Sequence, residues 1–406
     1  MSPVATLETV TSTARPSVDE RRTDDRPLRI AVIGARGLPS NYSGIERVCD
    51  SLYSLLAARG HQITMYCRPD HLAASRGEYR GIRLIRTRAL RLGPVETLSH
   101  AVTSLRHALR QEDYDLIHLH ALAPGLLSPF CRLRGKPTIA TVHGLDWQRA
   151  KWKGLGARVL RLAERMLVRY ADELIVLSHD LQEYFRTTYG RRTVRIPNGV
   201  ERTGPSAGNG AAQLEPLGLA PGEYIVYVGR LVPEKRVQDL IAAVGTLDTQ
   251  LKLAIVGEGG YTDAYVRGLR QAAADNPRVV FTGLQRGETL QALFRGAAMF
   301  VSPSELEGLP MSLLECMEHG TPAVVSDIPP HRELLGGRVG YDLFFPPGDV
   351  AALADRLRQV LAKPQHYRQV AARTQEYVRA EFSWSTVADR TEEVYRAVLA
   401  GKPTPT

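Results

Sequence analysis

The feature that most constrains the fold is an alternation of short apolar runs with helical patterns, which occurs in two separate blocks of the chain. The first block opens on the apolar run at residues 28–34, and the second opens at residues 224–228. The segment between them, residues 201–223, is dominated by Gly, Pro, Ala and Ser and breaks the pattern. Apolar strands that alternate with helices are typical of βαβ units around a parallel sheet. The sequence therefore predicts an α/β protein with two parallel-sheet lobes of similar size.

The same pattern divides the chain into domains. Parallel sheets bind ligands at the carboxyl ends of their strands, so two facing sheets would place a substrate site in the cleft between the lobes. The residues before the first strand are rich in Ser, Thr, Arg and Asp, which is typical of a disordered segment. We expect a disordered leader at 1–27, an N-terminal Rossmann-like domain at 28–200, a linker or loop at 201–223, a C-terminal Rossmann-like domain at 224–380, a C-terminal helix at 381–400 that returns to the N-terminal domain, and a tail at 401–406.

Composition excludes several classes of protein. A hydrophobic content of 44% and a charged content of 23% are ordinary for a folded domain, and no stretch approaches the roughly 20 apolar residues of a membrane span. The four cysteines stand far apart without a C-x-x-C pair, which predicts neither a zinc site nor a disulfide framework. The N-terminus lacks the apolar core of a signal peptide, so we expect a cytoplasmic protein. The net charge of +9 favours anionic partners, although no nucleic-acid motif is present.

The most specific segment is SPSELEGLPMSLLECMEHG, residues 302–320. Glu307 and Glu315 are separated by seven residues, and we expect a helix from Leu309 onward after a tight turn at Gly308. The N-terminus of a helix can bind a phosphate, and carboxylates beside it can accept hydrogen bonds from sugar hydroxyls. An arbitrary pair of glutamates at this spacing would be a capping residue and a solvated side chain. The context of strand, turn and helix makes that interpretation the weaker one here.

Cations and histidines follow other predicted strands. In YVGRLVPEKR, residues 227–236, Arg230 and Lys235 come after the first strand of the second lobe, where two cations can bracket a diphosphate. In the first lobe, His120 and His143 come at the ends of successive strands. Taken alone, the two cations would more often belong to a solvated basic loop, and each histidine would more often have a structural role.

Together these segments resemble retaining glycosyltransferase family 4, and the resemblance extends over residues 28–400. The stretch 302–320 is similar to the family's E-x7-E signature. GARGLPSNYSGIE, residues 34–46, and HGLDWQRAKW, residues 143–152, are similar to a subgroup that acts in bacterial exopolysaccharide assembly, of which several members transfer rhamnose. Ser43 stands where that subgroup has glycine. The resemblance implies the GT-B fold, in which two Rossmann-like lobes face a deep cleft, and a nucleotide-sugar donor used without a metal.

The resemblance also implies roles for the residues that match the family's motifs. In the C-terminal domain, one set is expected to bind the donor diphosphate (Arg230, Lys235, Leu309, Met311) and another the nucleotide or its ribose (Glu315, Gly257, Gly283). Three residues are expected to carry catalysis (His120, His143, Glu307). The N-terminal, acceptor-side domain is expected to supply a loop near donor and acceptor (Gly37, Ser43, Gly44) and contacts to the acceptor (Asp146, Trp147, Arg149). No metal ligand is expected.

Two further expectations concern side chains of the first lobe. We expect His118 to point to the opposite face of its strand from His120. Residues 149–170 carry an apolar stripe and an arginine stripe at helical spacing, and we favour packing of the apolar stripe on the lobe's own sheet, with the arginines open to solvent or to anionic lipid. The two stripes are Leu155, Val159, Leu162 and Met166, and Arg158, Arg161, Arg165 and Arg169.

The expected function is the transfer of a hexosyl or deoxyhexosyl group, with retention, from a nucleoside-diphosphate sugar to an acceptor hydroxyl. By resemblance to the polysaccharide subgroup, we expect a polyprenyl-diphosphate-linked or other glycan acceptor, contact with the inner face of an anionic membrane, no cofactor and no nucleic acid. A transferase of a soluble acceptor, a phosphorylase or epimerase on the same fold, and a non-catalytic GT-B scaffold stay open as alternatives. A Rossmann oxidoreductase is disfavoured because G-x-G-x-x-G is absent after Ile33.

Overall fold

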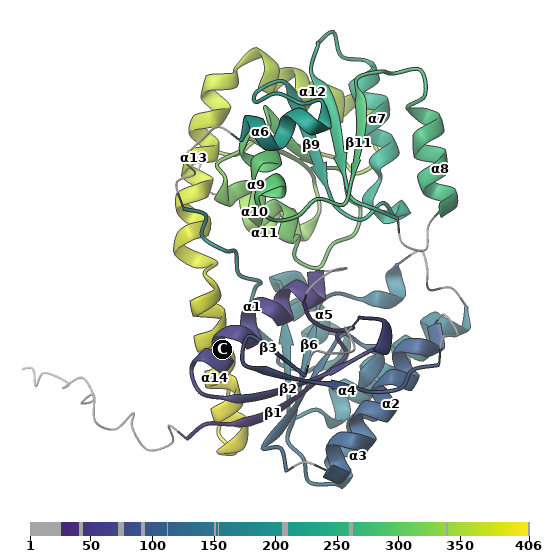
Figure 1. The fold of residues 1–406 in the computed structure, drawn as a ribbon, viewed down its shortest axis with the longest axis vertical. Helices are drawn as coiled ribbons and strands as arrows, with labels where there is room; N and C mark the ends of the chain where they lie inside the picture. Colours follow the sequence, from purple (N-terminus) through teal and green to yellow (C-terminus); the bar gives the residue numbers. More distant parts are fainter. Residues whose placement is uncertain are drawn as a thin grey trace, which may run out of the picture.

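The computed structural model describes residues 26–39, 44–71, 77–90, 94–111, 113–149, 152, 154–204, 210–259, 263–337 and 340–404. They form two α/β lobes, with the N-terminal lobe below the C-terminal lobe in Figure 1. This confirms the predicted fold class. Of the predicted leader and tail, residues 1–25 and 405–406 lie outside the described part of the chain.

The N-terminal lobe is built on an eight-stranded sheet in the order β3-β4-β2-β1-β5-β6-β7-β8, parallel except for the β3–β4 pair. Its central strands are buried continuous runs of apolar residues, as expected for a parallel sheet covered on both faces. The strands are β1 Arg29–Ile33, β2 Gln62–Cys67, β3 Glu78–Tyr79, β4 Ile82–Arg86, β5 Leu116–His120, β6 Thr138–Val142, β7 Glu173–Val176 and β8 Val194–Arg195, and the helices are α1 Gly44–Ala58, α2 Pro94–Gln111, α3 Ser128–Leu133, α4 Leu155–Tyr170 and α5 His179–Tyr189.

The C-terminal lobe is built on a six-stranded parallel sheet in the order β11-β10-β9-β12-β13-β14. The strands are β9 Tyr224–Val228, β10 Lys252–Val256, β11 Val279–Gly283, β12 Met299–Ser302, β13 Ala323–Ser326 and β14 Phe344–Phe345. The helices are α6 Ala211–Leu214, α7 Val237–Gly245, α8 Asp263–Ala272, α9 Gly287–Arg295, α10 Met311–Glu318, α11 Pro329–Leu335, α12 Val350–Ala362 and α13 Pro364–Glu381. Among the described residues, no helix of either lobe is both long and apolar enough to cross a bilayer.

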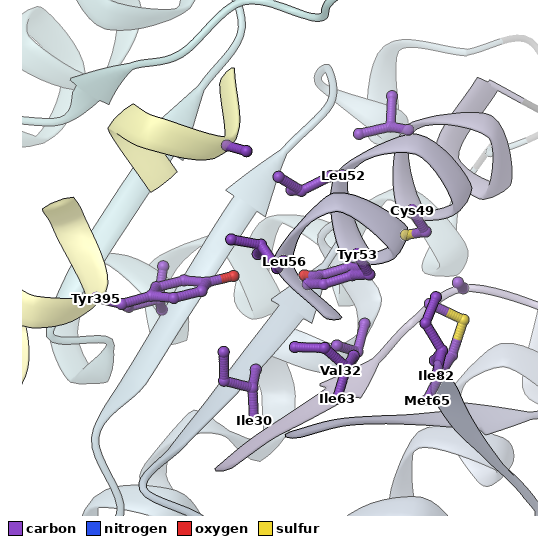
Figure 2. Close-up of a cluster of buried hydrophobic side chains, with 14 of the residues drawn as sticks. Ile30, Val32, Cys49, Leu52, Tyr53, Leu56, Ile63, Met65, Ile82 and Tyr395 are labelled. Atoms are coloured by element: carbon purple, nitrogen blue, oxygen red, sulfur yellow. The ribbon is translucent and has the colours of Figure 1, made fainter. Parts of the chain in front are cut away.

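Two neighbouring chain segments connect the lobes. The Val200 amide donates to the Phe382 carbonyl at 2.7 Å, and Val200 bridges Ser383 in parallel fashion. Gly199 lies so close to Trp384 that a Cβ there would come within 2.6 Å of the indole ring. Beyond this crossing, α14 (Trp384–Leu399) packs against α1, so the end of the chain belongs to the core of the N-terminal lobe, where Tyr395 is fully buried (Figure 2).

The predicted linker at 201–223 needs a correction, because its second half is folded onto the C-terminal lobe. Residues 211–217 form α6 and a short 3-10 turn, Glu215–Leu217. Leu214 and Leu219 are buried in the core of that lobe beside Tyr224. The Gly and Pro content that suggested a linker obscured these leucines, whose burial stabilises the segment.

Candidate active site

Each of the two sheets contains a point where its strand order reverses. The first strand of each sheet along the chain, β1 or β9, lies in the middle of that sheet. The next strands in the chain extend the sheet to one edge, and β5 or β12 then pairs with the other side of the first strand. Such switch points open a crevice at the carboxyl ends of the strands, which is where α/β sheets bind ligands. His120 ends β5, and the loop that carries Glu307 follows β12. The topology therefore brings the histidines of one lobe and the glutamates of the other to facing edges.

A backbone contact at Gly308 joins these edges. A Cβ on Gly308 would lie 1.9 Å from the carbonyl oxygen of His143, which follows β6. Gly144, at φ +152°, is the next residue on the opposite side, and a Cβ there would come 3.7 Å from the Gly308 Cα. Both positions therefore require glycine, Gly308 for the close approach and Gly144 for its backbone conformation.

Glu307 and Lys235 form an ion pair at the carboxyl end of the second sheet, with only 10% and 15% of their side chains exposed. Burial by itself would raise the pKa of Glu307, but the charges of Lys235 and His331 outweigh it and hold that pKa below its usual value. Burial lowers the pKa of Lys235, and the neighbouring Arg230 and Arg149 add to that decrease. Cations from both lobes thus act on one buried pair, and Glu307 is an anion at neutral pH.

Helix α10 begins two residues later than predicted. Pro310 is extended, at φ −74° and ψ 110°, so the first helical residue is Met311, and no side chain caps this end. Leu309 is buried in the core of the C-terminal lobe, and its carbonyl accepts a hydrogen bond from Asn198 Nδ2 at 3.3 Å. Met311 packs against the cores of both lobes and faces Gly44, the first residue of α1, where a Cβ would lie 4.0 Å from Met311 Cγ.

Glu315 lies one turn into α10 and is 14% exposed. Its carboxylate accepts hydrogen bonds from both terminal nitrogens of Arg47 in α1, with Nη1 at 3.2 Å from Oε2. Sequence reasoning missed Arg47, because nothing distinguishes it from the other arginines until the two lobes are placed together. The carboxylate assigned to the ribose is therefore held by a cation from the opposite lobe.

The three histidines of the first lobe lie together. The rings of His118 and His120 stack with centroids 4.4 Å apart, and those of His120 and His143 with centroids 5.2 Å apart. The prediction that His118 points to the other face was wrong, because residues two apart on a strand share a face. Burial lowers the pKa of His118 to about 3 and of His143 to about 4, and it also lowers that of His120. All three rings are neutral at physiological pH.

Of the predicted acceptor residues, Asp146 and Trp147 belong to the 3-10 turn Asp146–Gln148, and Arg149 follows it. Arg149 Nε pairs with Asp146 Oδ1 at 3.2 Å. The Trp147 indole donates to Glu164 of α4 at 2.9 Å, and Arg161 lies over the indole ring at 4.4 Å. Trp147 therefore anchors the turn to α4.

Glu164 itself was missed by sequence reasoning. It is fully buried and also accepts hydrogen bonds from Tyr184 at 2.7 Å and Tyr189 at 2.6 Å. Its position on the same face of α4 as Leu160 and Leu167 could have indicated burial from the sequence. A charged side chain on a buried helix face needs hydrogen-bond partners.

The face of α4 that packs on the lobe was also predicted wrongly. The buried residues are Leu160, Ala163, Glu164 and Leu167. Leu155, Val159 and Leu162 of the predicted buried stripe are instead 76%, 37% and 46% exposed. The helix carries two apolar stripes, and its neighbours select which one is covered.

The remaining predicted residues are glycines of strand-end loops. Gly37, at φ +156°, lies against the carbonyl of His71. Gly257, at φ +140°, lies so close to the Gly229 carbonyl that a Cβ would come within 1.9 Å, and its amide donates to the Gly283 carbonyl at 2.9 Å. Ser43 lies outside the described residues.

Comparison with known proteins gives consistent matches over both lobes. Residues 42–203 match the family described as Glycosyltransferase Family 4, and residues 215–377 match that described as Glycosyl transferases group 1. A glycogen synthase of Mycobacterium tuberculosis is 28% identical over 409 residues, covering 93% of this chain and 97% of that protein. The UDP-Gal:alpha-D-GlcNAc-diphosphoundecaprenol alpha-1,3-galactosyltransferase of Escherichia coli is 26% identical over 304 residues, covering 70% of this chain and 76% of that one. Among solved structures, sucrose-phosphate synthase from Thermosynechococcus elongatus superposes with a TM-score of 0.78 at 25% identity, covering 93% of this chain and 100% of that one.

Proposed function

The chain belongs to glycosyltransferase family 4 and has the GT-B fold, and from this premise we propose that it transfers a hexosyl or deoxyhexosyl group, with retention, from a nucleoside-diphosphate sugar to a lipid-linked saccharide. The observation that carries the donor half of this proposal is the buried pair of Lys235 and Glu307 at the switch point of the second sheet, beside the uncapped start of α10. Relatives include enzymes whose names specify a nucleotide-sugar donor.

The donor diphosphate would lie between the cations and the start of α10. Lys235 and Arg230 follow β9, and the first amides of α10 add the positive end of a helix dipole. Together these groups would neutralise the charge that develops as the sugar–phosphate bond breaks. Because they supply that positive charge, we propose that the reaction needs no metal ion.

The sugar would lie between Glu307 and the histidines. Glu307 is ionised because of Lys235, so it accepts hydrogen bonds from sugar hydroxyls. His120 and His143 are neutral, so they act as hydrogen-bonding groups rather than as proton donors of an imidazolium. Most of the rate would then come from positioning and fixed electrostatics.

The acceptor half of the proposal rests on a basic apolar face of the N-terminal lobe, formed by α3 and α4. Its apolar members are Phe130, Leu133, Leu155, Val159 and Leu162, which are 37% to 80% exposed, and its exposed arginines are Arg132, Arg134, Arg158, Arg161, Arg165 and Arg169. Exposed apolar side chains among arginines favour insertion at an anionic bilayer surface. We propose that this face rests on the inner leaflet and presents a polyprenyl-diphosphate-linked acceptor to the cleft.

The donor site is tested by calorimetric titration of UDP, GDP, ADP and TDP without metal. We expect one of them to bind at micromolar concentration and Arg230→Ala to weaken that binding at least tenfold. Arg267→Ala, on the exposed surface of α8, is the matched control and should bind as the native protein does. No binding by any of the four to folded protein would overturn the donor assignment.

The acceptor class is tested separately with the donor so identified. Flotation with vesicles containing anionic lipid should recover the native protein, and Leu133→Ser with Leu155→Ser should reduce the recovery. Transfer to a polyprenyl-diphosphate-linked sugar is expected. Transfer to a soluble oligosaccharide instead, with no flotation, would favour the second candidate, a transferase of a soluble glucan such as the name of the glycogen synthase relative suggests.

A further inference from the structure

One arginine of the N-terminal lobe lies where the two lobes touch. A Cβ on Gly144 would lie 3.8 Å from Arg149 Nη2 and 3.7 Å from the Cα of Gly308, which belongs to the opposite lobe. Glu307, the residue before Gly308, forms the buried ion pair with Lys235. The guanidinium of Arg149 therefore reaches from its own lobe to the edge of the proposed donor site.

The charge of Arg149 also acts on the buried ion pair of the other lobe. Burial lowers the pKa of Lys235, the charge of Glu307 opposes that decrease, and the guanidinium groups of Arg230 and Arg149 add to it. Arg230 follows β9 as Lys235 does, whereas Arg149 comes from across the cleft. Like charges this close repel one another, and an anion bound among them would relieve the repulsion. The arrangement therefore favours an anionic ligand that all three cations contact.

The turn that carries Arg149 is fixed to its own lobe. The Arg149 amide donates to the Asp146 carbonyl at 3.1 Å, and the Arg149 carbonyl accepts from the Trp152 amide at 2.9 Å. Trp147 joins the same turn to Glu164 of α4. The Arg149 side chain is 23% exposed, and its Nε pairs with Asp146 at 3.2 Å. One carboxylate thus orients the guanidinium, while Nη2 lies at the contact between the lobes.

We propose that Arg149 is a catalytic residue that contacts the donor diphosphate from the opposite lobe, at the phosphate that carries the sugar. This rests on the proposed function, because Glu307 beside it is the residue proposed to bind the sugar. It places Arg149 with Arg230 and Lys235 at the leaving group, whereas the resemblance implied a contact with the acceptor.

The chemistry of the transfer explains what a third cation would do. The bond between the anomeric carbon and the diphosphate oxygen breaks, and its electron pair stays on that oxygen. The acceptor oxygen bonds to the anomeric carbon, and its proton passes to the departing diphosphate. A guanidinium beside this phosphate would stabilise the negative charge that develops as the bond breaks.

Calorimetry tests the contact without turnover, using UDP, GDP, ADP and TDP and the matching monophosphates. Arg149→Gln should weaken binding of the nucleoside diphosphate about tenfold, as for loss of one charged hydrogen bond, and binding of the monophosphate less than twofold. Arg149→Lys keeps the charge and should stay within about threefold of the native protein. The long side chain of Arg149 can follow a small movement of the lobes, so only loss of its charge should have this effect.

Asp146→Asn separates a role in binding from a role in maintaining the turn. This variant keeps the guanidinium and removes a competing anion, so it should bind the diphosphate at least as tightly as the native protein. Equal weakening in Asp146→Asn and Arg149→Gln would show that the ion pair only holds the turn, and it would overturn the proposal. Arg186→Gln, which removes an ion pair of the same spacing with Glu183 on the exposed side of α5, should bind as the native protein does.

Hydrolysis of the donor without acceptor separates the leaving group from the acceptor. With water as the only nucleophile, Arg149→Gln should lower kcat for hydrolysis and kcat for transfer by the same factor, about a hundredfold. Unchanged hydrolysis with a raised KM for the acceptor would overturn the proposal and assign Arg149 to the acceptor. Failure of the native protein to bind any of the four diphosphates would instead refute the proposed function, on which the role of Arg149 depends.

Discussion

Replacing Gly308 with alanine tests whether catalysis requires the contact between the lobes that the structure shows. The added Cβ would lie 1.9 Å from the His143 carbonyl oxygen, and real Cβ atoms essentially never approach another atom closer than 3.0 Å. Both partners are backbone atoms, so no side chain can turn away. The lobes must therefore part by about 1 Å at this point, or the loop that carries Glu307 must shift by a similar amount.

The magnitude of the effect follows from where that shift occurs. A misplacement of about 1 Å between reacting groups costs on the order of a hundredfold in rate. Arg230 and Lys235 follow β9 in the second lobe, and when the lobes part they stay together with Glu307, so the nucleotide should bind almost as before. We therefore expect Gly308→Ala to lower kcat about a hundredfold and to change the Kd of the nucleoside diphosphate less than threefold.

Steady-state rates with the identified donor, together with calorimetry, measure both quantities. Gly268→Ala is the matched control: Gly268 lies inside α8 with no atom within 4 Å of an added Cβ. That change should leave kcat alone and raise stability by roughly 0.5–1 kcal/mol, since alanine favours a helix interior. A kcat for Gly308→Ala within twofold of the native value would show that the contact between the lobes plays no part in turnover.

Two further predictions concern buried titratable groups. Glu164→Gln places an amide where Trp147 and Tyr184 donate, so it should lower the free energy of unfolding by about 1–3 kcal/mol in urea titrations and shift the tryptophan fluorescence. Burial lowers the pKa of His100 from 6.5 to about 4, so the unfolded chain binds more protons between those values and stability falls as the pH drops through that range. Each such histidine contributes about 1.4 kcal/mol per pH unit, and His100→Gln should make the measured pH dependence shallower by that amount, whereas an unchanged slope would contradict the assignment.

The positions of the strands could be predicted closely from the sequence. The apolar run at 28–34 contains β1, and the run at 224–228 coincides with β9. They are strands buried on both faces, which appear in a sequence as short uninterrupted apolar runs. The residues at the ends of these strands were therefore placed at the correct edge of each sheet.

Contacts that depend on how the lobes and helices pack could not be predicted in the same way. Arg47 and Glu315 are 268 residues apart, and their pairing exists only because the start of α1 faces α10. On α4, two apolar stripes were available, and only the packed structure shows that Leu160 and Leu167 are covered while Leu155 is exposed. The error at His118 was different, because its spacing from His120 already placed both on one face.

One of the contacts between the lobes involves Glu315, a residue that the proposed donor site would use. Besides the close approach at Gly308, the lobes are linked by Arg47–Glu315 and by Arg195–Glu333, in which the arginine side chains are 42% and 20% exposed and the glutamate side chains 14% and 9% exposed. Solvent reaches the Arg47 guanidinium and screens that pair, whereas Arg195–Glu333 is shielded on both sides, and breaking it would leave a buried carboxylate unpaired. If Glu315 binds the ribose as proposed, the donor must replace Arg47 there, and the cost of that replacement is small. The packed crossing at Val200 and Trp384 joins the lobes independently of these ion pairs.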